Sequence, residues 1–201
     1  MQILGIEYLD KGKFIVSFDC EEEILLYRSE IKELNLEEGS FINSEKYNDI
    51  LNIVSKRAKK RAMHILEKRD KTEKQLRDKL KEGKYPDSAI DKAIDYVKSF
   101  RYLDDSRYAY NYISYRIESK SRANIIGALV VKGINKDLAS EIYDELYDPS
   151  YTSDQIEKLL EKKKYFKTDE RQKQNRIIQS IMRKGFSYND ISKFISKHEN
   201  F

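Results

Sequence analysis

A short motif, a basic residue followed by glycine and an apolar residue, recurs along this 201-residue chain at intervals of about fifty residues. It reads Lys132-Gly133-Ile134 and Lys184-Gly185-Phe186, and Lys81-Glu82-Gly83-Lys84-Tyr85 is a looser copy with one extra residue after the glycine. Each copy follows a basic helical stretch and precedes a short apolar one, as expected where glycine ends a helix. A period of this length, with each unit a helix triplet, is typical of tandem repeats that bury their apolar stripes against each other. The motif therefore predicts a mainly α fold, an elongated array of three-helix repeats.

The stretch from Lys71 to Tyr112 carries the clearest helix boundaries. A hydroxyl and an amide at capping-box spacing predict a helix start, which Gly83 should end. The sequence Tyr85-Pro86-Asp87 predicts a second start, and Asp104 is expected to cap a third helix, flanked by a hydrophobic staple. The residues given structural roles by these signals are Thr72, Gln75, Tyr102, Leu103, Asp104, Tyr108, Gly133 and Gly185.

The head of the chain alternates apolar and polar residues and predicts a small sheet, with strands near residues 3–9, 14–19 and 22–27 and a hairpin turn between the first two. So small a sheet must pack on helices to be stable. The apolar stripe from Tyr47 to Leu66 fits one long helix or two helices broken near Ser55. We expect a β-rich acidic extension over residues 1–55 that ends in a helix, and repeats over residues 56–100, 101–149 and 150–201.

In the later repeats, apolar residues at helical spacing predict the helix faces. Val130 and Met182 are assigned to two of these faces, and a further helix is expected to start at Thr152 or Ser153. A last group concerns tyrosines: Tyr108, Tyr112 and Tyr115 share one helical face, which could be core or could stack on nucleic-acid bases. We expect Tyr102 and Tyr108 to be more buried than Tyr110 and Tyr115.

Charge is strongly segregated within the net +4 of the chain. Residues 1–55 carry −7, residues 56–84 carry +8, residues 85–161 carry −4 and residues 162–184 carry +7. Basic blocks are often solvated helix faces, but two of them beside an acidic segment also suit a phosphate track or an acidic partner. The chain has no apolar run of the roughly 20 residues that span a bilayer and no signal-peptide pattern, so a cytoplasmic protein that does not bind membranes is expected.

The sequence offers little for catalysis. His64 and His198 stand apart from any other metal ligand, and Cys20 is the lone cysteine. Asp104-Asp105 could be a metal or nuclease pair, but a helix start explains it better. We therefore expect no enzyme activity, no catalytic residues, no metal and no cofactor.

Three motifs in order resemble the RecX family, the regulatory proteins that modulate the recombinase RecA. They are residues 69–80 (RDKTEKQLRDKL), residues 102–109 (YLDDSRYA) and residues 129–134 (LVVKGI). The resemblance covers about residues 57–200, and the acidic head is similar to the N-terminal extension of members from Gram-positive lineages. The chain departs from the family where a glycine is usual and Arg101 stands, and where a glycine-containing run and an arginine are replaced by Lys120-Ser121-Arg122-Ala123-Asn124.

The resemblance implies tandem three-helix repeats without catalysis that bind in the groove of the RecA–single-stranded DNA filament, block its growth or promote its disassembly. The expected partners are the RecA filament and single-stranded DNA, with the chain itself a monomer. Alternatives are a DNA-binding module acting without RecA, a divergent nuclease and a scaffold with no link to nucleic acid. The candidate contact residues are Lys60, Arg61, Arg69, Lys71, Lys74, Arg77, Arg107, Arg116, Arg122, Lys132, Lys163, Lys164, Arg176, Arg183 and Lys184.

Overall fold

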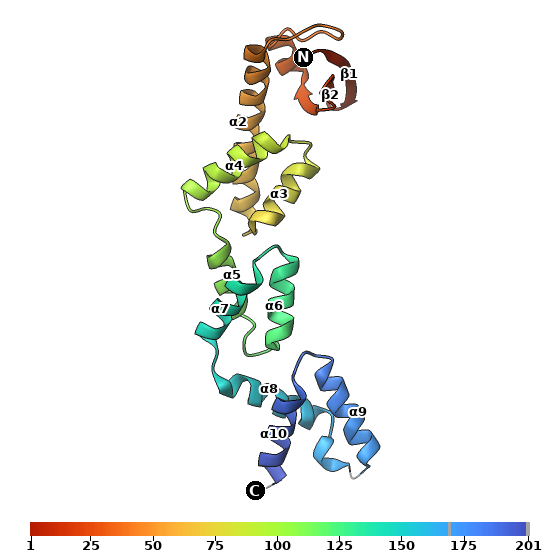
Figure 1. Ribbon diagram of the computed structural model, residues 1–201, viewed down its shortest axis with the longest axis vertical. Helices are drawn as coiled ribbons and strands as arrows, with labels where there is room; N and C mark the ends of the chain where they lie inside the picture. Colours follow the sequence, from red (N-terminus) through yellow and green to blue (C-terminus); the bar gives the residue numbers. More distant parts are fainter. Residues whose placement is uncertain (169, 200–201) are drawn as a thin grey trace. The chain divides into compact units, whose positions relative to one another are not determined.

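The computed structural model describes residues 1–168 and 170–199 (Figure 1). A small antiparallel sheet comes first, and everything after it is helical. The predicted class, mainly α with a β-rich N-terminal part, is therefore confirmed. The chain forms two compact units, Met1–Asp104 and Asp105–Phe201, and each is described by itself.

The sheet of the first unit has the order β1-β2-β3, with β1 (Ile3–Asp10), β2 (Lys13–Phe18) and β3 (Glu23–Tyr27) antiparallel. The hairpin between β1 and β2 turns at Lys11 and Gly12, whose φ angles are 43° and 76°. Positive φ at both central residues is the geometry that matches the right-handed twist of paired strands. The predicted turn is thus present.

The helices of the first unit are α1 (Arg28–Glu33), α2 (Ser44–Lys68), α3 (Glu73–Glu82) and α4 (Asp87–Ser99). The Asn43 side chain accepts a hydrogen bond from the Lys46 amide and begins α2. That helix runs through Ser55 without a break, so the stripe between Tyr47 and Leu66 belongs to one helix. Thr72 and Gln75 form the capping box at the start of α3.

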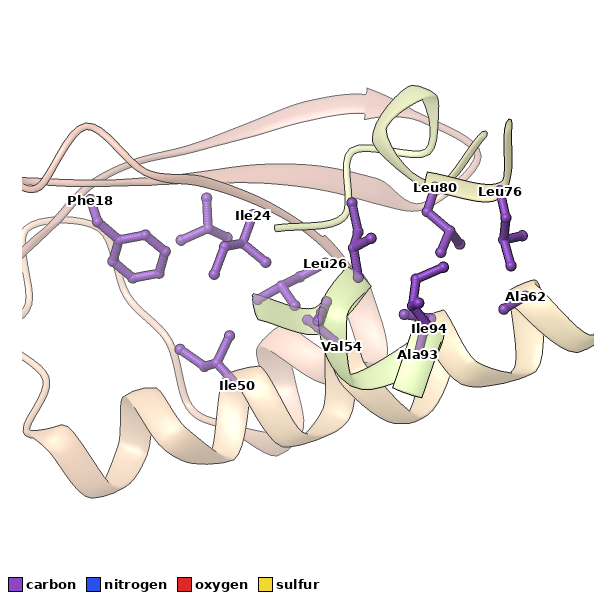
Figure 2. Packing of buried hydrophobic residues seen from close by; sticks show 14 of the residues in the cluster. Phe18, Ile24, Leu26, Ile50, Val54, Ala62, Leu76, Leu80, Ala93 and Ile94 are labelled. Carbon is purple, nitrogen blue, oxygen red and sulfur yellow. The ribbon is translucent and has the colours of Figure 1, made fainter. Parts of the chain in front are cut away.

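One core joins the sheet and the helices of this unit. Phe18, Ile24 and Leu26 of the sheet face Ile50 and Val54 on the first half of α2 (Figure 2). Farther along the same helix the core continues against α3 and α4, where Ala62, Leu76, Leu80, Ala93 and Ile94 are buried. A single helix therefore supports both the sheet and the first helix triplet.

The second unit contains two helix triplets, each with its own core. Ile113, Leu129 and Ile142 are buried in the first of these cores, and Ile156, Leu160 and Ile181 in the second. The elements are α5 (Asp105–Ser114), α6 (Arg122–Val131), α7 (Lys136–Leu146), α8 (Pro149–Lys162), the 3₁₀ turn η1 (Tyr165–Lys167), α9 (Arg171–Met182) and α10 (Tyr188–Glu199).

Several details differ from the expectations. The helix expected to start at Thr152 or Ser153 begins at Pro149, because Asp148 accepts a hydrogen bond from the Ser150 amide and proline suits the first turn. Val130 and Met182 are 44% and 42% exposed, so both lie off their predicted core faces.

The tyrosine prediction is wrong for one residue. Tyr102 is 49% exposed, the same as Tyr110, because its ring stacks beside Phe100 at the surface while the neighbouring Leu103 enters the core. Tyr108 is partly buried, and it packs on the core of the second unit. Leu103 belongs to the core of the first unit. Leu103 and Tyr108, the two residues of the expected hydrophobic staple, therefore pack in different cores.

The turns after α3, α6 and α9 each contain one residue in the left-handed backbone conformation. Gly133 and Gly185 have φ of 94° and 87°, the left-handed region that glycine favours. In the turn after α3 this role falls to Lys84, with φ of 58°, while Gly83 has ordinary φ as the C-cap. The next residue, Tyr85, then donates its amide to the Leu80 carbonyl, as in a Schellman motif. Lys84 thus occupies the position that glycine holds in the later copies.

Candidate nucleic-acid interface

The first basic block, residues 56–84, covers the second half of α2 and all of α3, and its charges on α3 face carboxylates. Arg77 bonds to Glu73 (Nε–Oε1 2.8 Å) and to Asp91 of α4 (Nη1–Oδ1 2.7 Å). Lys98 of α4 also pairs with Glu73. These contacts fasten α3 to α4. The lysines of α3 make three further ion pairs, Lys74–Asp78, Lys79–Glu82 and Lys81–Asp87.

The pKa values of Glu73 and Arg77 reflect these ion pairs. Partial burial alone would raise the pKa of Glu73, but hydrogen bonds from Lys98 and Arg77 outweigh it and lower that pKa. Hydrogen bonds to Asp91 and Glu73 in turn raise the pKa of Arg77. Both shifts favour the charged forms of Glu73 and Arg77, and each charge faces an opposite charge within the protein. An external anion would have to compete with carboxylates already in place.

Arg57 has a structural role that sequence reasoning missed. It donates to the Glu30 carboxylate (2.6 Å) and to the Leu25 carbonyl, which ties α2 to α1 and β3. Its guanidinium also lies 4.8 Å from the ring centre of Tyr27 and 5.5 Å from that of Tyr85. Within a run of lysines and arginines, no sequence signal separates this partly buried contact from its solvated neighbours. The candidates of this block that lie on α2 and the loop after it are Lys60, Arg61, Arg69 and Lys71.

The candidate cations of α5–α7 are also engaged with the protein. The Arg116 guanidinium lies 3.9 Å from the ring centre of Tyr112, and the Lys132 ammonium lies 5.7 Å from the same ring. Tyr108 stacks on Tyr112 at 6.4 Å, so this pair is part of the core edge. Tyr115, the third residue of the predicted stripe, is 85% exposed. The stripe is therefore divided between core and surface.

Arg122, a predicted contact residue, is the first residue of α6. It pairs with Asp144 of α7 through both carboxylate oxygens, at 3.0 and 2.9 Å, and its guanidinium lies 5.5 Å from the ring centre of Tyr143. Arg122 thus connects α6 to α7. Of the remaining candidates, Arg107 precedes the tyrosine pair on α5 and is exposed.

Residues 120–124, where the sequence departs from the family pattern, form the junction between the two triplets of the second unit. Ser121 Oγ and Asn124 Nδ2 both donate to the Lys184 carbonyl, at 2.6 and 2.8 Å. Gln155 Nε2 donates to the Ile117 carbonyl at 2.7 Å. Gly185 fits against this contact, since an added Cβ would lie 2.6 Å from Ser121 Oγ. These side chains hold the later triplet against the start of α6.

The second basic block forms an open groove around η1 and the start of α9. The 3₁₀ turn brings residues 163–167 beside α9, and the groove has a volume of about 420 Å³. Its lining is cationic except for a threonine hydroxyl and one isoleucine: Lys163, Lys164, Lys167, Thr168, Lys173, Arg176 and Ile177. Of the five cations, Lys173 pairs with Glu170 at 2.5 Å, and no ion pair of the other four is found among residues 1–168 and 170–199.

The structure thus sorts the predicted candidates into two kinds. Lys74, Arg77, Arg122, Arg116 and Lys132 are engaged with carboxylates or aromatic rings, whereas Lys163, Lys164 and Arg176 line one groove. Arg183 and Lys184 are exposed on the turn after α9. Sequence reasoning missed the lining residues Lys167, which lies on η1, and Lys173, which lies on α9, because the sequence did not predict the 3₁₀ turn beside α9.

Metal sites and membrane-spanning helices bear on other kinds of function. Within the described part of the chain, no group of three or more histidine, cysteine or acidic side chains lies close enough to hold a metal ion. Over the same residues, no helix is both long and apolar enough to span a bilayer.

Comparison with known proteins places the chain. A family model described as the first three-helix domain of RecX matches residues 58–96, and one described as the third three-helix domain matches residues 151–195. Regulatory protein RecX of Finegoldia magna is 31% identical, and the alignment covers 98% of each chain. This chain belongs to the RecX family. Regulatory protein RecX of Clostridium perfringens is 30% identical over 96% of this chain and 89% of that protein.

A solved crystal structure of regulatory protein RecX has the same fold, with a TM-score of 0.68 at 22% identity over 97% of this chain and 98% of that one. Arg101, which precedes the Tyr102-Leu103-Asp104-Asp105 motif, adopts φ of 58°. Glycine suits that position because the left-handed region costs it little.

Proposed function

We propose that this protein binds the RecA recombinase on single-stranded DNA and restrains the growth or activity of the filament. The observation that carries the proposal is the similarity to regulatory protein RecX over nearly the full length of both chains. The residues support a binding function: exposed cations line a groove, and the three helix triplets are held by apolar cores and ion pairs. Inhibition would then come from occupying the filament, without any chemical step.

Each helix triplet is proposed to make its own contact with the filament. We assign one unit of binding to each triplet, over residues 56–100, 101–149 and 150–201, with residues 1–55 as an acidic extension. The protein acts as a monomer in this proposal, because its apolar stripes are buried in its own three cores. Sedimentation of the purified chain at micromolar concentration should give the mass of one copy.

The experiment is a titration of the purified protein into RecA that hydrolyses ATP on single-stranded DNA. Amounts below that of RecA should slow both ATP hydrolysis and strand exchange. No effect on either reaction up to equimolar protein would remove the proposal. Because the readout is RecA's own turnover, the result does not depend on which of the protein's residues make the contact.

A second candidate function is direct binding of DNA without RecA, which the cationic groove favours. In that case the protein would slow RecA only by covering DNA. A single-stranded-DNA-dependent ATPase unrelated to RecA is the control. Equal inhibition of that enzyme at equal protein concentration supports the DNA-only function, whereas inhibition confined to RecA supports the regulator.

A further inference from the structure

The two basic blocks carry almost equal charge but differ in how that charge is used. In residues 56–84, at +8, Arg57, Lys74, Arg77, Lys79 and Lys81 each pair with a carboxylate. In residues 162–184, at +7, the ion pair found within the described residues is Lys173–Glu170. On α3 all four cations face carboxylates, whereas Lys163, Lys164, Lys167 and Arg176 of the groove have no ion pair among residues 1–168 and 170–199.

A cation that already faces a carboxylate gains less from an incoming phosphate, because the new contact must replace an existing one. It also neutralises a phosphate less completely, so fewer of the cations condensed on the nucleic acid are released, and that release drives nucleic-acid binding. The groove of η1 and α9 has neither restriction at Lys163, Lys164, Lys167 and Arg176. All four side chains line this one groove, which has a volume of about 420 Å³.

The backbone conformation at Lys164 also supports a binding role for the groove. Lys164 has φ of 58°, a left-handed conformation in which glycine would be less strained. Its side chain is exposed, so burial does not account for a lysine here. Non-glycine residues held in such conformations gather at functional sites, where a side chain is needed despite the strain. Lys84 and Arg101 also have left-handed backbones but lie outside the groove, so this conformation alone does not mark a binding site. The groove is the observation that decides.

We propose that this groove binds the phosphate backbone of single-stranded DNA, and that the paired cations of α3 contribute little to that binding. The proposal rests on the function proposed above and locates its DNA contact. Lys163, Lys164 and Lys167 on one side and Arg176 on the other neutralise successive phosphates, and no base is read. Binding should therefore depend on salt and be nearly independent of sequence.

The test compares three full-length triple variants with equal loss of charge. The groove variant is Lys163→Gln, Lys164→Gln and Lys167→Gln. The repeat control removes three exposed lysines of the same triplet outside the groove, Lys158→Gln, Lys193→Gln and Lys197→Gln. The α3 variant is Lys74→Gln, Lys79→Gln and Lys81→Gln. Fluorescence anisotropy with labelled oligo-dT at several salt concentrations gives the affinity and its salt slope.

Each single-strand phosphate contact contributes a slope of about 0.7, so losing three should flatten the slope by about 2 and weaken binding about a hundredfold at 0.1 M salt. We expect that change in the groove variant, with the repeat control and the α3 variant close to wild type. Equal losses in the groove variant and either other triple would overturn the proposal, as would an unchanged slope in the groove variant.

A single variant separates binding from folding. Lys164→Gly removes one cation and relieves the backbone, so it should weaken oligo-dT binding about fivefold at 0.1 M salt while raising the melting temperature. Weaker binding with a lower melting temperature would mean damage to the fold and would not support the groove. Poly-glutamate is the competing probe: if it displaces oligo-dT equally well per unit charge, the groove takes acidic protein and the assignment to DNA falls.

The RecA titration keeps this result apart from the proposed function. If the wild-type protein slows RecA and the groove variant keeps its DNA slope, the groove is wrong and the regulator stands. If the wild-type protein has no effect on RecA, the proposed function fails whatever the groove binds.

Discussion

Replacing Gly185 by alanine should destabilise the second unit more than a glycine substitution usually does, because backbone and packing act against it together. The φ of Gly185 is 87°, in the left-handed region, and its missing Cβ faces Ser121 Oγ at 2.6 Å and the Ala123 Cβ at 3.1 Å. Ser121 cannot simply turn away, since its hydroxyl donates to the Lys184 carbonyl and accepts from the Asn124 amide.

The magnitude follows from three contributions. A non-glycine residue in the left-handed region costs about 1–2 kcal/mol. Forcing an extra carbon into a packed contact costs about 1–3 kcal/mol. Alanine recovers about 0.4–1 kcal/mol, because it has less freedom than glycine in the unfolded chain. The free energy of unfolding of the second unit should therefore fall by about 2–4 kcal/mol.

Urea unfolding followed by circular dichroism measures this change, and Gly39→Ala is the matched control. Gly39 has φ of 78° but nothing within 4 Å of its added Cβ, so it reports the backbone cost alone, about 1 kcal/mol. In a Ser121→Ala background the steric cost at Gly185 should shrink, giving a coupling of about 1–2 kcal/mol between the two positions. Equal losses at Gly185 and Gly39, or no coupling to Ser121, would refute the packing argument.

Two further predictions concern the first unit. Lys84→Gly should raise its free energy of unfolding by about 0.5–1 kcal/mol, because glycine relieves the left-handed backbone and its added freedom in the unfolded chain offsets only part of that gain. A lower free energy of unfolding in urea would contradict this. The pKa of Glu73 is lowered in the folded protein, so its stabilising effect is fully present above the unfolded value of about 4.5 and is lost as pH falls through the folded pKa. Glu73→Gln should therefore lose stability at pH 7 and lose less at pH 3, and an equal loss at both pH values would show that the ion pairs do not cause the effect.

The repeat architecture could be predicted from the sequence because its signals are local. A capping box at Thr72 and Gln75 and a glycine turn at Gly133 depend on neighbouring residues only. The Asp148-Pro149 pair carries a local signal too, since α7 ends at Leu146 and Asp148 caps the start of α8.

The candidate site was less predictable, because the sequence shows which residues are charged but not which residues they pair with in the fold. Arg77 and Lys163 look alike in their basic runs, yet one bridges two carboxylates and the other lines an open groove. The difference depends on Asp91, fourteen residues away on the next helix, and on a short 3₁₀ turn with no periodic pattern. Likewise, no local rule places Ser121 against the carbonyl of Lys184.

The length of α2 has a practical consequence for anyone who studies the acidic head by deleting it. The helix rises about 1.5 Å per residue, so its 25 residues form a rod of roughly 37 Å, with Ile50 under the sheet and Ala62 under α3. A deletion that ends at residue 43 would strip the sheet from the first half of this rod and leave Ile50 and Val54 in water. Loss of activity in such a truncated chain would reflect a damaged support for the first repeat as much as a missing contact. Point substitutions on the outer face of the sheet, at Glu7 for instance, would test the head while leaving the rod covered.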